Sequence, residues 1–242
     1  MTDSTSAGQS EVTPEVARGV RKWFIKTVLG VPMPGVVLCL CAGRWDWAMA
    51  WVYAGMMLAL QALTAAVLLP TNPELLAERS QPQRGGKTWD TVLVILSVGI
   101  GMIGTWVVAG LDLRFGWLPS IPLPLSVIAV GVGMLGIGLL VWAMAANRFF
   151  SVSVRIQTER GHAVATGGPY RCVRHPGYVG WLIVTLATPV VLGSQWAFVP
   201  TGISVPLMIL RTALEDRTLH GELEGYREYA ERVRHRLLPG IW

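Results

Sequence analysis

Long apolar runs separated by short polar segments dominate the pattern of this chain. Three runs contain no charged residue over at least 20 positions: 48–69, 91–110 and 121–146. At 1.5 Å per residue, a helix of that length crosses about 30 Å of hydrocarbon. An earlier run ends at Ala42 and contains Pro32 and Pro34, which predict a kink or an interruption. Residues 18–146 are therefore predicted to form the first four membrane spans.

Two shorter apolar runs follow, 177–192 and 197–210, with Gly193-Ser194-Gln195 between them. Each is at the short end for a full crossing, so tilt or burial against other helices has to help. We interpret residues 177–210 as a helical hairpin, and re-entrant helices are the alternative. The predicted fold class is all-α, a polytopic transmembrane helical bundle of about six spans.

The two ends of the chain are polar. Residues 1–17 are rich in Ser, Thr, Glu and Pro, predict a disordered head and lack the apolar core of a cleavable signal peptide. In the tail, residues 211–242, apolar positions recur at steps of three and four between Ala213 and Leu238. This spacing predicts a C-terminal amphipathic helix that lies on the bilayer or caps the bundle. Its apolar positions are Leu219, Leu223, Tyr226, Ala230, Val233 and Leu237.

Composition and charge support a multi-pass integral membrane protein. Charged residues make up 14% of the 242 positions, whereas soluble domains carry about 25%. If successive loops lie on alternating sides of the membrane, 18 of the 20 Lys and Arg residues fall on one side, and only Arg44 and Arg114 fall on the other. The positive-inside rule places both termini, the 70–90 loop and the 147–176 loop in the cytoplasm. This topology explains the net charge of +5, so no nucleic-acid partner is expected.

Several motifs are better explained by structure than by chemistry. Gly99-x-Gly101-x-x-Gly104 and Gly131-x-Gly133-x-x-Gly136 resemble dinucleotide fingerprints but lie inside apolar runs. The fingerprint needs a strand-to-helix turn, so close helix packing is the better interpretation. The four histidines and three cysteines lack metal-ligand spacing, and no metal is expected.

The 147–176 loop carries the densest set of polar groups. Gly167-Gly168-Pro169 predicts a tight turn just before Tyr170. His175 precedes Pro176 and Gly177, which start the next helix and leave its first amides free for a carboxylate or polar ligand. We predict a cytoplasmic binding loop, and interfacial anchoring is the alternative.

Arg211 and Glu215 lie one helical turn apart at the end of the last apolar run. They share a helix face. By the predicted topology they lie at the same membrane depth as His175, because both positions mark cytoplasmic ends of spans. Ionisable groups at membrane depth are functional candidates, and an ordinary ion pair at positions i and i+4 is the alternative.

Together these residues resemble the isoprenylcysteine carboxyl methyltransferase family, integral-membrane enzymes that use S-adenosylmethionine, within a wider group that includes phospholipid methyltransferases. The resemblance runs from Asn147 to the C-terminus, with a weaker likeness over residues 72–79. The motifs that carry it are Gly168-Pro-Tyr-Arg171, Arg174-His-Pro-x-Tyr178, Arg211-x-x-x-Glu215-Asp216, Tyr226-x-x-Tyr229 and Leu238-Pro239.

The resemblance implies that residues 147–242 form a methyltransferase-like region that binds S-adenosylmethionine and releases S-adenosylhomocysteine. The implied cofactor contacts are Gln157, His162, Ala163, Val164, Ala165, Tyr170, His175, Pro176, Gly177, Tyr178 and Glu215. Arg211 matches a residue on the substrate side and is the predicted catalytic residue.

The chain departs from the family pattern in three places. Ala165 replaces a Val, the spacing from Gln157 to His162 differs, and Leu223-Glu-Gly-Tyr226 replaces a Phe-Gly-Glu-Glu-Tyr segment of eukaryotic members. The last departure predicts that the tail packs differently.

The implied roles agree with the chemistry of the cofactor. Glu215 would meet a positive group or a ribose hydroxyl, His175 the amino-acid end, and the rings of Tyr170 and Tyr178 the adenine or the sulfonium. Arg211 would orient an acceptor carboxylate that enters from the lipid through a side opening.

The acceptor itself stays open among an isoprenylcysteine-like carboxylate, a phospholipid amine and a small thiol. Two other classes of function are kept as alternatives. An NADPH-dependent membrane reductase would show a basic cluster without a central acid such as Glu215. A transporter or scaffold would show polar residues at mid-span, and spans two to four have almost none.

Overall fold

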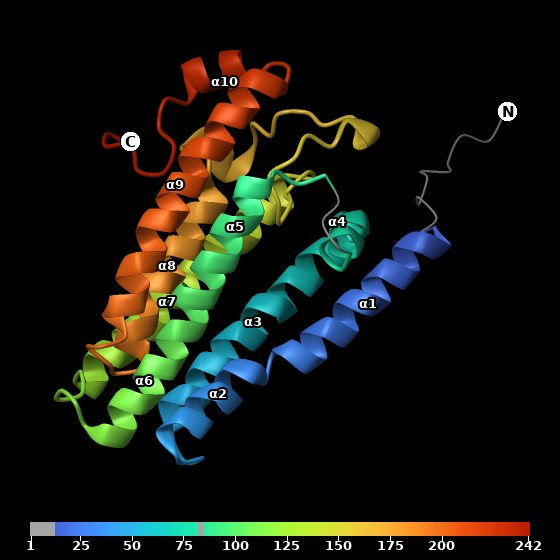
Figure 1. Ribbon diagram of the computed structural model, residues 1–242. Coiled ribbons are helices and arrows are strands. Elements are labelled where there is room, and N and C mark those ends of the chain that lie inside the picture. The colour runs from blue at the N-terminus through green and yellow to red at the C-terminus, as the bar shows by residue number, and fades with distance from the viewer. Residues whose placement is uncertain (1–12, 82–84) are drawn as a thin grey trace, which may run out of the picture.

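The computed structural model describes residues 13–81 and 85–242, and every regular element in these ranges is helical (Figure 1). The α-helices are α1 (Pro14–Gly30), α2 (Met33–Ala42), α3 (Ala48–Thr71), α4 (Pro73–Arg79), α5 (Thr88–Leu96), α6 (Gly104–Phe115), α7 (Leu123–Ala146), α8 (Pro176–Val191), α9 (Phe198–Glu222) and α10 (Tyr226–Arg232). A π-helix, η1 (Ser97–Ile103), and two short 3₁₀ turns, η2 (Thr158–Arg160) and η3 (Gly168–Arg171), complete the set.

Four helical segments are long and apolar enough to cross a membrane, as an integral membrane protein requires. They are Pro14–Ala42, Ala48–Thr71, Thr88–Phe115 and Leu123–Ala146. These segments match the four predicted spans. The apolar helix α8 has 16 residues and contacts both α7 and α9 (Figure 1). That α8 and α9 cross the membrane as well stays a prediction.

The first span is interrupted where the two prolines predict it. Helix α1 ends at Gly30, and α2 begins at Met33 after a turn that contains Pro32. The start of α1 differs from the prediction, because Thr13 accepts a hydrogen bond from the Val16 amide and the helix begins at Pro14. Residues 14–17 of the predicted disordered head are therefore helical, and residues 1–12 lie outside the described residues.

The third span contains a π-helical segment that lets α9 come close. A Cβ atom added at Gly101 of η1 would lie 2.1 Å from Oγ of Ser204 on α9. Ser204 also donates a hydrogen bond to the Ser97 carbonyl across this contact, at 3.3 Å. The glycine at this position confirms the close-packing interpretation of its motif.

Helices α7 and α8 pack closely through two facing glycines. A Cβ added at Gly136 would lie 2.8 Å from the Gly180 carbonyl, and one added at Gly180 would lie 2.6 Å from the Gly136 carbonyl. The second dinucleotide-like pattern therefore also has a packing role, at Gly136. This contact fixes α8, whose first turn carries several of the predicted site residues.

The glycine contact gives a testable expectation for Gly180→Ala. The added methyl group collides with the α7 backbone, so we expect the free energy of unfolding in detergent to fall by about 1–3 kcal/mol. Gly138→Ala is the matched control, because Gly138 lies on α7 with open space around its Cβ position. Equal stability of the two variants in a denaturant titration would contradict the packing role.

The tail is not the single amphipathic helix predicted for residues 213–238. Helix α9 continues without interruption to Glu222, Leu223 is extended, and the chain turns at Gly225 with φ of +76° before α10 begins. A positive φ suits glycine, which has no Cβ, and this turn leads from the end of α9 into α10. Helix α9 therefore continues past residue 210, where the predicted hairpin ends.

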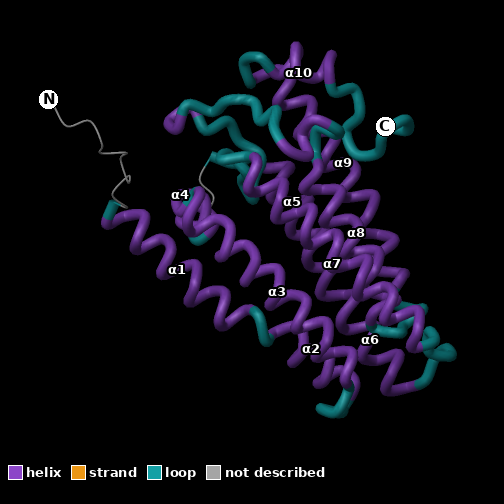
Figure 2. Tube along the Cα trace, turned by 180° about the vertical axis from the view of Figure 1, so that it is seen from behind, coloured by secondary structure: helices purple, strands orange, loops and turns teal. Residues whose placement is uncertain are grey.

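The apolar stripe of the tail is nevertheless buried together. Leu223, Tyr226 and Tyr229 form a cluster with Tyr170 and Ala143, so the tail packs on the bundle and on the 147–176 loop. Figure 2 shows this loop and α10 at the same end of the molecule, the end that also carries α4. The structure thus brings three segments far apart in sequence to one face.

Candidate functional site

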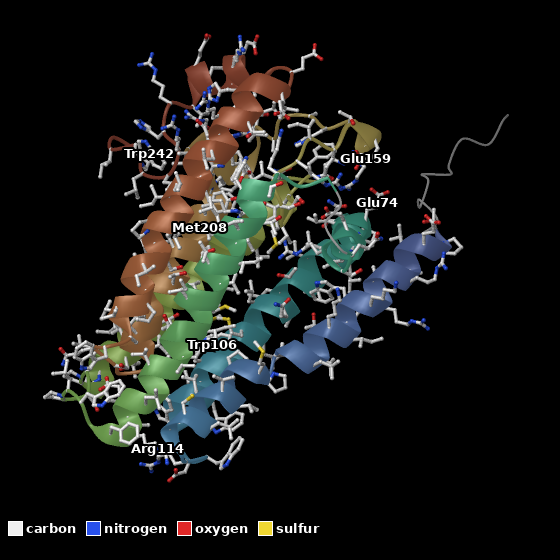
Figure 3. The ribbon with its side chains drawn as sticks, in the orientation of Figure 1. Glu74, Trp106, Arg114, Glu159, Met208 and Trp242 are labelled. Atoms are coloured by element: carbon white, nitrogen blue, oxygen red, sulfur yellow. The ribbon has the colours of Figure 1, made fainter. Side chains whose placement is uncertain are left out.

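A cavity of about 580 Å³ joins the loop end of the molecule to the middle of the membrane helices. Its volume falls in the range of small-molecule sites, about 300–1,000 Å³. Its lining includes polar residues of the 147–176 loop, α8, α9 and α10, which we call the polar part, and apolar residues of α1, α2, α3, η1 and α7, which we call the apolar part. Trp106 and Met208, which both line the cavity, lie at different depths along the bundle (Figure 3).

Most of the predicted site residues line this cavity. They are His162, Ala163, Val164, Ala165, Tyr170, His175, Gly177, Tyr178, Arg211 and Glu215. Gln157 and Pro176 are not among the lining residues. The buried Gln157 donates to the Phe149 carbonyl at 2.8 Å and accepts from Arg160 at 2.7 Å, so it stabilises the loop from within.

His162 is neutral and has a defined tautomer. Its Nδ1 accepts a hydrogen bond from the Gln157 amide at 3.2 Å, which leaves the proton on Nε2. Burial lowers the pKa of His162, and the nearby Arg155 and Arg160 lower it further. The cavity wall therefore contains a neutral hydrogen-bond donor at this position.

Tyr178 and Glu215 form the polar centre of the cavity. The Tyr178 hydroxyl donates a hydrogen bond to the Glu215 carboxylate. The Tyr178 ring is stacked on the His175 ring, with 5.8 Å between the ring centroids. The Tyr178 ring also contacts Arg211, whose Cζ atom lies 5.2 Å from the centroid of the tyrosine ring. Glu215 thus meets a tyrosine, and the simple ion pair with Arg211 is not formed.

Arg211 pairs instead with Asp90 of α5, a residue that was not predicted from the sequence. Nε of Arg211 lies 2.6 Å from the Asp90 carboxylate, and Nη2 donates to the Val152 carbonyl at 2.6 Å. Asp90 also accepts from the Val154 amide at 2.8 Å. A charged residue at the end of an apolar span was the only signal for Asp90 in the sequence. The pair connects α5, the loop and α9 beside the cavity.

Asp216 is a further buried carboxylate at this end of the molecule, and its side chain is 1% exposed. It accepts hydrogen bonds from Arg174 at 2.7 and 3.0 Å, from Arg236 at 2.8 Å and from the Tyr226 hydroxyl at 2.8 Å. The His175 ring nitrogen lies 3.2 Å away. Burial alone would raise the pKa of Asp216, but its bonds to His175, Arg174 and Arg236 outweigh burial and hold the pKa well below its usual range.

The amides that precede α8 are occupied by the tail. The Arg174 amide donates to the His235 carbonyl at 2.9 Å, and the His175 amide donates to the Arg236 carbonyl at 3.0 Å. In the first turn of α8 itself, the Tyr178 and Val179 amides donate to the His175 carbonyl at 3.1 and 3.3 Å, so the expectation of free amides is wrong for these two groups. The bonds to the tail are made by the two amides just before the helix. They fix the backbone of the loop, while the His175 side chain lines the cavity.

Residues 129–221 match the isoprenylcysteine carboxyl methyltransferase (ICMT) family. The matched residues make up less than half of the chain, and over them the chain is similar to the ICMT family. Two relatives from Oryza sativa, of subspecies indica and japonica, are each called "Probable protein-S-isoprenylcysteine O-methyltransferase" and are 34% identical over 117 residues, 46% of this chain and 61% of theirs. "Protein-S-isoprenylcysteine O-methyltransferase A" of Arabidopsis thaliana is 32% identical over 92 residues, 37% of this chain and 47% of its own length. The matches therefore cover less than two thirds of each relative.

The matched residues, 129–221, contain most of the polar part of the cavity. They include His162, Tyr170, Tyr178, Glu215 and the buried Asp216. The apolar lining from α1, α2, α3 and η1 comes from outside the matched residues, as do the Asp90 carboxylate and the tail after residue 221, whereas Leu140 and Met144 of α7 lie within them. Most of the polar lining thus lies within the matched residues, while much of the apolar lining is supplied by the rest of the chain.

Proposed function

We propose that this protein transfers a methyl group from S-adenosylmethionine to a lipophilic acceptor that carries a carboxylate, as isoprenylcysteine does. The observation that supports it is a single cavity lined both by polar residues of the matched segment 129–221 and by apolar residues of the membrane helices. We call the space beside these two sets of residues the polar chamber and the apolar chamber. A polar donor and a membrane-borne acceptor would meet where the two parts join.

The residues of the polar chamber fit this cofactor. Bound S-adenosylmethionine would supply a methyl group on a positively charged sulfur. Glu215 offers a carboxylate to a positive group or a ribose hydroxyl, and the aromatic faces of Tyr170 and Tyr178 suit adenine or a cation. His162 offers the neutral N–H donor described above.

The protein would contribute alignment and exclusion of water, because a direct displacement needs no covalent nucleophile. An acceptor carboxylate is already ionised near pH 7, so no general base is required. Leu223, Tyr226 and Tyr229 cover Tyr170 and shield the chamber. Arg211, held by Asp90 and the Val152 carbonyl, would orient the acceptor group and keep the role of catalytic residue.

The apolar chamber would hold the lipid part of the acceptor. Its walls include Met33 and Pro34 of α2, Leu60 of α3, Met102 of η1 and Trp106 of α6. These side chains present no charge to a bound chain and match the hydrocarbon of a prenyl or acyl group. Membrane lipids are the neighbours from which such an acceptor would enter.

We propose the cytoplasm as the compartment of the site and of both termini. The 147–176 segment, α4 and α10 lie at one end of the bundle, and Arg114 lies at the other (Figure 3). The segments that the sequence assigns to the first end hold 18 of the 20 Lys and Arg residues, as expected of a cytoplasmic side. This orientation requires α8 and α9 to act as the fifth and sixth spans.

A binding experiment separates the functional classes. Purified protein in detergent is titrated calorimetrically with S-adenosylhomocysteine and with NADPH, and only the former is expected to bind. Binding of NADPH alone would favour a reductase, and binding of neither would favour a scaffold or transporter.

A second experiment identifies the acceptor group. A membrane-lipid extract is methylated with labelled cofactor. Base treatment releases the label as methanol from a methyl ester but leaves it on a methylated amine or thiol, which identifies the acceptor group.

Glu215→Gln tests the polar chamber. The change keeps the shape of the side chain but removes its charge, and we expect the affinity for S-adenosylhomocysteine to fall about 10- to 100-fold, the size of a charge-assisted hydrogen bond. Glu222→Gln is the control, because Glu222 ends the same helix and pairs with Lys87 outside the cavity. Normal affinity of Glu215→Gln in calorimetry would contradict its assignment as a cofactor contact.

A further inference from the structure

The cationic residues that line the cavity differ in how they are neutralised. Arg155 pairs with Glu159, Arg174 with Asp216 and Arg211 with Asp90. Two further cations line the cavity, Lys26 of α1 and Arg79 of α4. Within residues 13–81 and 85–242, neither of these two has a carboxylate oxygen within ion-pair distance, 4.0 Å. The cavity therefore contains uncompensated positive charge at one part of its wall.

Arg79 is the stronger of the two anchors. Its Cζ atom lies 6.0 Å from the centroid of the Phe150 ring, and it donates no hydrogen bond to another described residue. Burial lowers the pKa of the Arg79 guanidinium, a direction that Glu78 partly opposes. A guanidinium carries five N–H donors, and leaving them unpaired in a low-dielectric site is costly. An anionic ligand would relieve this cost.

Lys26 adds a second positive charge next to Arg79. Its ammonium group donates to the carbonyl of Ser80, the residue that follows Arg79, at 2.6 Å. Helices α1 and α4 are held together here, because a Cβ added at Gly19 would lie 2.5 Å from Cβ of Ala77. The two cations are thus fixed relative to each other by helix packing rather than by flexible loops.

Phe150 places Arg79 close to the polar chamber without making it part of that chamber. A Cβ added at Gly177, in the first turn of α8, would lie 2.6 Å from the same Phe150 ring. One aromatic ring therefore contacts both Arg79 and the turn that carries Tyr178. On the other side, Lys26 is followed along α1 by Thr27 and Gly30, which line the cavity with the apolar residues of α2.

We infer that Arg79, assisted by Lys26, binds the carboxylate of the methyl acceptor at the junction of the two chambers. This inference rests on the proposed function and names Arg79 as the residue that sets its specificity for an anionic acceptor. Arg211 is already neutralised by Asp90 and would orient the acceptor without adding net charge. Arg79 supplies the unpaired positive charge that selects an anionic amphiphile over a neutral one.

The kinetic test compares Arg79→Gln with Arg171→Gln, an exposed arginine at the same end that does not line the cavity. The substrate is N-acetyl-S-farnesylcysteine with labelled S-adenosylmethionine. Arg79→Gln is expected to raise KM about 10- to 100-fold while kcat changes less than about threefold, and Arg79→Lys should recover part of the loss. An unchanged KM would overturn the inference.

A binding test distinguishes acceptor recognition from donor recognition and from the proposed function itself. Affinity for S-adenosylhomocysteine should be the same in Arg79→Gln and wild type, and an equal loss would assign Arg79 to the carboxylate of the donor instead. Wild-type protein should bind the farnesylcysteine carboxylate more tightly than its amide, with or without turnover, and Arg79→Gln should lose this preference. A retained preference would overturn the inference, whereas absent binding of S-adenosylhomocysteine to wild type would overturn only the proposed function. Lys26→Gln, expected to lose part of the preference, keeps the test valid should Arg79→Gln not fold.

Discussion

The Asp216→Asn variant is expected to lose about 3–5 kcal/mol of stability, the largest loss expected from any change described here. The carboxylate is buried among Arg174, His175 and Arg236, and it also accepts from Tyr226. Asparagine keeps the volume but removes the negative charge, so the buried Arg174 and the partly exposed Arg236 both lose their counterion. The tail should detach from the loop, and S-adenosylhomocysteine should bind poorly as a consequence.

This expectation is checked by limited proteolysis of the tail and by denaturant titration in detergent. Glu224→Gln is the control, because Glu224 is exposed on the same segment. The pH dependence gives an independent readout. The pKa of Asp216 is depressed in the folded state, so its stabilisation is complete above the unfolded value of about 4 and is lost as the pH falls below it. The difference between wild type and Asp216→Asn should therefore shrink on acidification, and a constant difference would contradict the assignment.

Arg211→Ala is expected to reduce kcat by about 10²- to 10³-fold, the cost of losing an orienting charge, while affinity for S-adenosylhomocysteine is largely retained. The variant also leaves the Asp90 carboxylate buried without its cation, which lowers stability. Loss of turnover alone would therefore not distinguish a catalytic role from a structural one.

The double variant Asp90→Ala/Arg211→Ala makes the distinction. Removing both charges should restore much of the stability lost in Arg211→Ala, because no unpaired ion remains. If Arg211 orients the acceptor, turnover stays low in the double variant although the protein is folded. Recovery of turnover along with stability would show that Arg211 acts only through the Asp90 pair. Arg217→Ala, on an exposed face of the same helix, controls for the substitution itself.

The membrane helices could be predicted because their signal is local. Each span is a continuous apolar run whose length alone matches the bilayer, and Pro32 marks the break in the first one. The course of the tail could not be predicted from periodicity, because the apolar stripe continues through Leu223 and Tyr226 while Gly225 reverses the backbone. Periodicity reports which positions are buried, and it reports nothing about a turn between them.

The candidate site was predicted as far as its residues lie together in sequence. The loop, the start of α8 and Glu215 carry a recognisable motif, and most of them line the cavity. Asp90 lies 121 positions from Arg211, so nothing local to either residue indicates the pair. Gln157 was assigned to the ligand, but its buried side chain bonds within the loop. Pairings between distant segments are set by the fold and need the structure.

The hydrogen bonds between the loop and the tail affect the order in which the protein is assembled. The carbonyls of His235 and Arg236 hold the amides of Arg174 and His175, and they leave the ribosome only after all the membrane helices have been made. A nascent chain stopped after Glu222 would already contain its apolar chamber but not the segment that covers the polar one. Insertion into the bilayer and completion of the site are therefore separate events, and the second follows the first.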